Sequence, residues 1–69
     1  MKAPILLKFG KRVRQLRDER DISQEKLGEL AKVHRTYVGM IERGEKNITL
    51  GNIEKLAKAL KVSVTDLFS

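Results

Sequence analysis

The chain has 69 residues, of which 41% are hydrophobic, and its formal net charge is +6 at pH 7. This length allows one small domain, and the lack of cysteine excludes disulfides and thiolate metal sites. One histidine cannot build a metal cluster, and no stretch approaches the ~20 apolar residues of a membrane span. We therefore expect a cytoplasmic protein without cofactor or small-molecule ligand. Its basic excess favours a polyanionic partner, most often nucleic acid.

Helical spacing dominates the first half of the chain. Apolar residues recur at intervals of three and four and predict a helix over about residues 6–20, with Pro4 before it or in its first turn. Ser23 is a favoured N-cap and predicts a second helix over about residues 24–31. A third helix, over about 34–42, follows after only a short connector.

The second half continues the same pattern. Gly44 is a suitable left-handed cap for the third helix, and Thr49 is a suitable N-cap for a fourth helix over about residues 50–60. Ser63 caps a last short helix that ends near Leu67. No segment alternates with a period of two. The fold class is therefore all-α, a compact five-helix domain whose expected core includes Leu27, Leu30, Val38, Ile41, Leu50, Ile53, Leu56 and Leu60.

The second and third helices are short and nearly contiguous. Such a tight connection forces a steep crossing, as in a helix-turn-helix spanning about residues 24–43, and the small residues Gly28 and Ala31 would ease it. On a helical wheel Val38 and Ile41 of the third helix point inward. Gly39 falls on the outer side, where it costs about 1 kcal/mol relative to alanine. We interpret this bare position as one that admits a bulky partner such as the major groove of DNA.

The chemistry of this outer side suits base recognition. Arginine donates two hydrogen bonds to guanine O6 and N7, and threonine and methionine suit thymine methyl groups. The predicted base contacts are Arg35, Thr36, Tyr37, Gly39 and Met40. Backbone N–H groups at the start of the second helix attract phosphate. The predicted phosphate contacts are Gln24, Arg43, Lys46 and Asn47.

Several motifs together resemble a known family. "SQEKL", "IERG" and "LAKALKVSVTDLF", with "RVRQLRDERD" before them, are similar to the lambda-repressor-like helix-turn-helix regulators (the Cro/repressor or xenobiotic-response-element type) over about residues 7–68. The stretch "RTYVGMIERGEKNITL" resembles the small controller proteins of restriction–modification systems. The resemblance implies sequence-specific binding to double-stranded DNA by a homodimer on a pseudo-palindrome. It also implies a structural ion pair between Arg17 and Glu42.

The chain departs from the family pattern at two positions in the motif. Lys32 stands in the turn where many relatives have glycine, so it must accept a left-handed conformation, at about 1 kcal/mol, or alter the turn. His34 stands where serine, aspartate or asparagine usually caps the recognition helix, and histidine is a poorer cap.

Apolar residues at the two ends of the chain offer surfaces for self-association. The C-terminal group, Val64, Leu67 and Phe68, exceeds what a short last helix needs to close the core, and we predict that it forms a two-fold dimer interface. Ile5, Leu6 and Leu7 are the alternative surface.

Other classes of function remain as alternatives. A protein-interaction module, for example an antitoxin that masks a partner protein, fits a small helical domain, and a phage repressor fits the same motifs. A membrane-surface role would also use positive charge. An enzyme is disfavoured because the adjacent carboxylates Asp18, Glu19 and Asp21 have no histidine or metal partner, and no nucleophile–base pair can be assembled.

Overall fold

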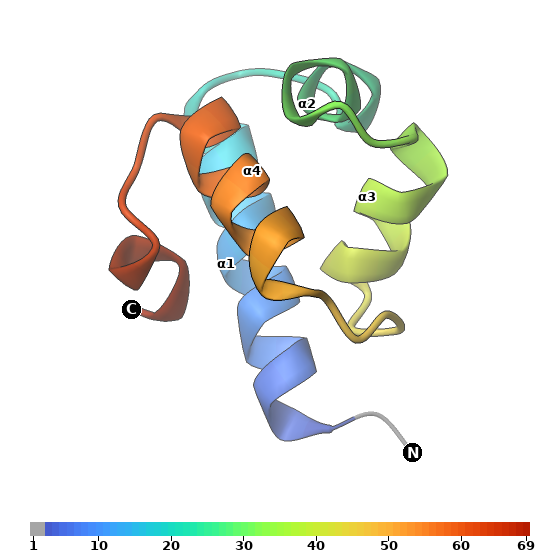
Figure 1. Ribbon diagram of the computed structural model, residues 1–69, viewed down its shortest axis with the longest axis vertical. Helices are drawn as coiled ribbons and strands as arrows, with labels where there is room; N and C mark the ends of the chain where they lie inside the picture. Colours follow the sequence, from blue (N-terminus) through green and yellow to red (C-terminus); the bar gives the residue numbers. More distant parts are fainter. Residues whose placement is uncertain (1–2) are drawn as a thin grey trace.

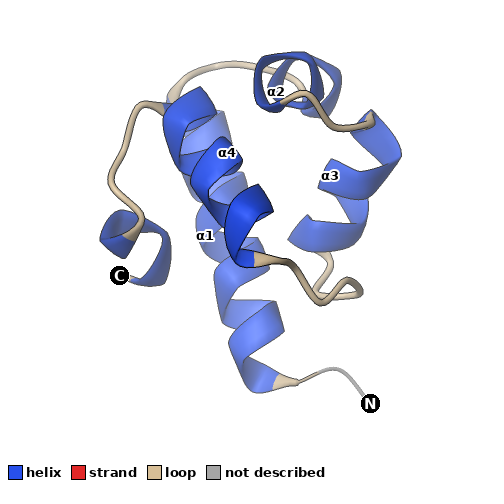
Figure 2. Cartoon of the chain, in the orientation of Figure 1, coloured by secondary structure: helices blue, strands red, loops and turns tan. Residues whose placement is uncertain are grey.

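The computed structural model describes residues 3–69 and consists of helices joined by short turns. Its α-helices are α1 (Pro4–Glu19), α2 (Gln24–Ala31), α3 (Arg35–Glu42) and α4 (Leu50–Leu60). A short 3-10 helix, η1 (Thr65–Phe68), follows them. No strand occurs between residues 3 and 69 (Figure 2). The all-α prediction is confirmed, but residues 3–69 contain four α-helices, and the predicted fifth is this single 3-10 turn.

Local side-chain chemistry explains where these helices begin. Pro4 occupies the first turn of α1, where its missing N–H needs no partner. Ser23 Oγ accepts a hydrogen bond from the Lys26 backbone N–H at 2.9 Å, and Thr49 Oγ1 accepts one from Asn52 at 3.1 Å. The predicted bounds of α2 and α4 are therefore confirmed, because each begins at a cap visible in the sequence.

The last turn is also capped by its own side chains. Ser63 donates its backbone N–H to Asp66 Oδ2 at 3.0 Å, and Asp66 returns its N–H to Ser63 Oγ at 3.2 Å. Hydrogen bonds from the backbone and the side chain of Ser63 lower the pKa of Asp66. Arg12 Nε then donates to the Asp66 carbonyl at 2.7 Å, which fastens η1 to α1.

The helices surround one apolar core. In Figure 1, α2 and α3 lie on one side of the molecule, η1 lies on the opposite side, and α4 passes in front of α1. Every helix contributes at least one buried side chain: Phe9, Val13, Leu16, Leu27, Ala31, Val38, Ile41, Ile53, Leu56, Ala57, Leu60 and Leu67. Two predicted core residues are wrong. Leu30 is 48% exposed and Leu50 is 84% exposed, since each lies on the solvent side of its short helix.

The turn between α2 and α3 brings the two backbones into close contact. A Cβ atom on Gly28 would lie 2.7 Å from the Val33 carbonyl oxygen, so this crossing requires glycine. Lys32 accepts the left-handed conformation, with φ of 60°, rather than altering the turn. His34 does cap α3, because its Nδ1 accepts the Thr36 backbone N–H at 3.0 Å. The helix consequently starts at Arg35, one residue later than predicted.

Between residues 3 and 69, no helix combines the length and the apolar character that crossing a bilayer requires.

The Gly28 contact generates a stability prediction. Gly28→Ala should lower the free energy of unfolding by about 1–3 kcal/mol, because the new methyl group must displace backbone. Gly51→Ala is the matched control, since the nearest atom to a Cβ at Gly51 is 4.0 Å away. That control should instead raise the free energy of unfolding by about 0.5–1 kcal/mol. Urea denaturation followed by circular dichroism measures both, and equal changes would contradict the close contact.

Candidate nucleic-acid interface

A buried ion pair holds the two helices of the motif against α1. Arg17 Nε donates to Glu42 Oε2 at 2.7 Å, and Arg17 Nη2 donates to Glu42 Oε1 at 3.1 Å. The two side chains are only 12% and 4% exposed. Arg17 Nη1 also donates to the Ile22 carbonyl at 2.8 Å. The end of α3 and the approach to α2 are thereby fixed relative to the same α1 side chain.

The same carboxylate reaches the first residue of α2. Gln24 Nε2 donates to Glu42 Oε1 at 3.1 Å, so one acidic group orients both Arg17 and Gln24. The hydrogen bond to Glu42 raises the pKa of the Arg17 guanidinium; burial opposes that rise, and the charges of Glu42 and Asp18 add to it. A primary amide has two N–H donors, so Gln24 keeps one for a ligand at the N-terminus of α2.

The start of α3 presents polar groups to solvent. Arg35 and Thr36 are exposed, and Met40 is half-buried. Arg35 Nη1 donates to Glu25 Oε2 at 2.9 Å in a pair whose side chains are 64% and 62% exposed. A pair this exposed holds the guanidinium only weakly, so Arg35 can exchange its carboxylate for another acceptor.

Tyr37 is held more firmly than its neighbours. It is half-buried and packs against the core, and its hydroxyl oxygen accepts a hydrogen bond from Asn52 Nδ2 at 3.0 Å. Lys46 Nζ lies 6.0 Å from the centre of the ring, at the outer limit of a cation–π contact. Lys46 and Asn47 themselves are exposed in the loop before α4. Tyr37 therefore connects α3 to α4 and to this loop.

Gly39 is not the bare exposed position that the sequence suggested. It is buried, because two side chains cover it. A Cβ atom there would lie 3.1 Å from Arg43 Nη1 and 3.5 Å from Gln24 Oε1. Arg43 is 55% exposed, and its Nε donates to Glu45 Oε1 at 3.0 Å. Side chains predicted to contact phosphate thus cover the glycine that was predicted to contact bases.

The C-terminal apolar group is only partly available to a partner. Leu67 is completely buried in the core, so its predicted place in a dimer interface is wrong. Val64 and Phe68 are each 41% exposed, and the ring centroids of Phe68 and Phe9 are 5.2 Å apart. The alternative N-terminal surface adjoins this one, because Ile5, Leu6 and Phe68 line the same shallow hollow.

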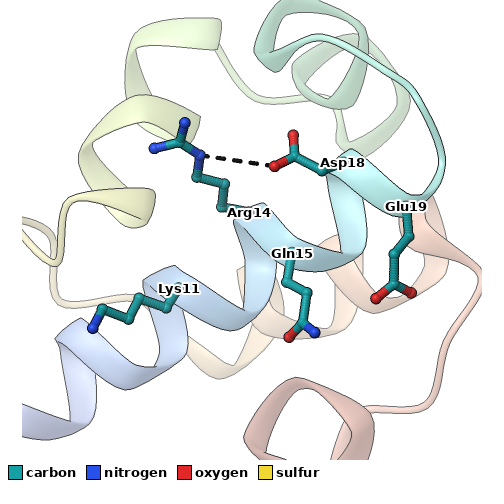
Figure 3. Close-up of a pocket in the computed structure, with 5 residues that line it drawn as sticks. All are labelled: Lys11, Arg14, Gln15, Asp18 and Glu19. Atoms are coloured by element: carbon teal, nitrogen blue, oxygen red, sulfur yellow. Dashed lines mark ion pairs between the residues drawn. The ribbon is translucent and has the colours of Figure 1, made fainter.

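A second hollow lies along the solvent side of α1 (Figure 3). Its lining consists of Lys11, Arg14, Gln15, Asp18 and Glu19, all from this one helix. Arg14 Nε and Asp18 Oδ2 are 3.9 Å apart, which is a weak surface ion pair. In residues 3–69, no group of three or more histidine, aspartate or glutamate side chains is arranged to hold a metal ion. This side of α1 is an ordinary solvated helix face.

Four residues that shape the interface were not predicted. Gly10 allows α1 to approach α3, since a Cβ there would clash with the carbonyl oxygens of Ile41 and Glu42. A glycine beside the inward residue Phe9 was an available signal. Glu25, Glu45 and Asn52 partner Arg35, Arg43 and Tyr37 respectively. The Asn52 contact had no sequence signal, because it joins residues 15 positions apart.

The fold and this arrangement of α2 and α3 define a helix-turn-helix protein, and the chain belongs to the helix-turn-helix family whose model matches residues 13–67. It is 52% identical over 64 residues to control protein C.BamHI of Bacillus amyloliquefaciens, covering 91% of this chain and 79% of that protein. It is 46% identical over 61 residues to control protein C.SmaI of Serratia marcescens, covering 88% and 73%. The crystal structure of the restriction–modification controller protein C.AhdI from Aeromonas hydrophila matches with a TM-score of 0.90 and 49% identity, covering 91% and 96%.

The buried pair generates the second prediction. Glu42→Ala should lower the free energy of unfolding by about 3–5 kcal/mol, because it leaves the Arg17 charge buried without a partner. Glu25→Ala removes an equal charge from an exposed pair and should cost at most about 1 kcal/mol. Chemical denaturation of both variants provides the comparison. A Glu42→Ala variant as stable as Glu25→Ala would show that the pair is not structurally required.

Proposed function

We propose that this chain is a transcriptional regulator that binds double-stranded DNA sequence-specifically as a homodimer, in the manner of a restriction–modification controller protein. The observation that carries the proposal is the 52% identity over 64 residues with a control protein. The geometry supports it independently. Arg35 at the exposed start of α3 reaches Glu25 in the first turn of α2, and Glu42 at the end of α3 accepts hydrogen bonds from Gln24 and Arg17, which fixes both helices.

In this proposal α3 enters the major groove. An α-helix fits the groove, and Arg35 is free to leave Glu25 for guanine O6 and N7. Thr36 and Met40 lie where thymine methyl groups can be contacted. Gln24, Lys46 and Asn47 bind phosphate on the two sides of α3 and position the helix without reading sequence. Tyr37, which is held between α3 and α4, is a further base contact in this proposal.

The dimer in this proposal forms through the C-terminal side of the molecule. Val64 and Phe68 are exposed there, and Ile5 and Leu6 extend the same apolar surface around a common hollow. Since η1 and α3 lie on opposite sides in Figure 1, joining two η1 surfaces carries the α3 helices to the outer ends of the dimer. The protomer measures 29 × 24 × 21 Å, a size suited to two α3 helices about 34 Å apart in successive major grooves.

Electrostatic attraction adds affinity for DNA that does not depend on sequence. The net charge of +6 favours any duplex DNA and makes binding strongly dependent on salt concentration. We propose that the protein acts in the cytoplasm and that dimerisation rises with its own concentration. Three of the relatives that match it are named control proteins, and another is named an immunity repressor protein.

Base reading by Arg35 is tested with two DNA substrates. Selection from a random duplex pool supplies the operator, and Arg35→Ala should then weaken operator binding by about 1–3 kcal/mol while changing random-duplex binding far less. Lys46→Ala is the matched control, because loss of a phosphate contact should weaken both complexes similarly and reduce the salt slope by about one. Equal losses for Arg35→Ala on both duplexes would refute direct readout. Failure to select any sequence at about 0.15 M salt would refute the proposed function itself.

The interface is tested by the oligomeric state. Val64→Glu should convert the dimer to monomers, because a carboxylate in a two-fold apolar surface meets its own symmetry mate. Leu30→Glu places the same charge on a leucine of comparable exposure, 48% against 41% for Val64, outside the C-terminal surface and should leave the dimer intact. Sedimentation equilibrium measures both variants. Dissociation by Leu30→Glu but not by Val64→Glu would place the interface on α2 instead.

A further inference from the structure

We infer that Gly39 is a specificity-determining residue that acts through Arg43. Gly39 and the neighbouring side chain of Gln24 form what we call the Arg43 seat, which holds the Arg43 guanidinium on the outer surface of α3. This inference rests on the proposed function and extends it. It changes the proposed role of Arg43 from a phosphate contact to a second base contact, about two helical turns beyond Arg35.

The spacing along α3 makes the seat possible. Arg35, Gly39 and Arg43 follow one another at intervals of four residues, so they share one side of the helix. Helical side chains lean toward the N-terminus and cover the preceding turn. The Arg43 side chain therefore lies back across residue 39, where any side chain would compete with it for space.

Distances at Gly39 show how closely the guanidinium approaches. A Cβ atom would lie 3.1 Å from Arg43 Nη1, which is closer than ordinary van der Waals contact, and 3.5 Å from Gln24 Oε1, which is an ordinary contact distance. Both nearby groups are the ends of side chains rather than backbone. An alanine at this position can consequently be accommodated without unfolding α3, but only if the guanidinium moves.

Two further contacts restrict where Arg43 can go. Its Nε donates to Glu45 Oε1 at 3.0 Å, which directs the remaining guanidinium N–H groups toward the seat. Gln24, which borders the seat, is itself fixed by Glu42 at 3.1 Å. The Arg43 charge is thus placed before DNA arrives, and pre-placement of a long flexible side chain reduces the entropy lost on binding.

The alternative explanation is that glycine lets DNA approach the α3 backbone directly. That explanation needs an open surface at residue 39, but Gly39 is buried beneath Arg43 and Gln24. The cost of a glycine inside a helix, about 1 kcal/mol relative to alanine, is then accounted for by the position of Arg43. Both explanations predict weaker DNA binding by a Gly39 variant, and they differ in whether that loss depends on Arg43.

A double-mutant cycle separates them. Operator and random-duplex affinities are measured by fluorescence anisotropy for the wild-type chain, Gly39→Ala, Arg43→Ala and the double variant. Arg43→Ala should weaken operator binding about 10-fold, within the range of a bidentate base contact, and random-duplex binding much less. Gly39→Ala should weaken operator binding about threefold in the wild-type background and not measurably in the Arg43→Ala background.

Stability provides the second readout. Gly39→Ala and the control Gly51→Ala should both unfold at a urea concentration no lower than the wild-type chain, since alanine is the better helix former. Gly51→Ala should leave both DNA affinities unchanged, because residue 51 lies in open space on α4. A gain in stability with a loss of operator affinity, for Gly39→Ala alone, is the expected signature.

Three results would overturn the inference while leaving the proposed function intact. One is the same loss of operator affinity by Gly39→Ala with and without Arg43, which would mean that DNA itself needs the bare position. Another is an equal loss for Arg43→Ala on operator and random duplex. The third is unfolding of Gly39→Ala, which would assign the glycine to packing. Absence of operator binding by the wild-type chain would instead remove the proposed function.

Discussion

The double hydrogen bond between Arg17 and Glu42 is the constraint on which the proposed interface depends. It joins α1 to the last residue of α3. The same carboxylate accepts a hydrogen bond from the side-chain amide of Gln24, the first residue of α2. Two helices of eight residues each are too short to be stable alone, so tertiary contacts must set their relative position. A charge pair that is largely buried fixes the orientation of the helices it joins more than it adds to the net stability of the fold.

Close backbone contacts at two glycines also fix the position of α3. Gly28 lets α2 meet the start of α3, and Gly10 lets α1 meet its end, so α3 is held closely at both ends. Between these points Val38 and Ile41 are buried in the core, and Tyr37 packs against it. The outer side of α3 therefore contributes little to packing, so its residues can be suited to binding a ligand.

Both arginines on this outer side are paired with carboxylates before any partner binds. Arg35 lies against Glu25, and Arg43 lies against Glu45 and the Arg43 seat. Exposed pairs of this kind are weak and easily exchanged, yet they hold long side chains in a limited set of directions. Such an interface can distinguish a hydrogen-bond acceptor of matching geometry from a surface that is merely negatively charged. Only the matching acceptor replaces the hydrogen bonds that the carboxylates accept from the arginines.

The four α-helices, most of the core and the family could be predicted from the amino-acid sequence, because periodicity and capping residues such as Ser23 and Thr49 act over a few positions. The solvent exposure of Gly39, Leu30, Leu50 and Leu67 depends instead on how the helices pack together. A helical wheel gives a side chain's direction but not what lies beyond it. Arg43 and Gln24 cover the outward Gly39, Leu50 stays exposed to solvent, and the 3-10 turn directs Leu67 into the core. Contacts such as Asn52 with Tyr37 join separate helices, so no local pattern encodes them.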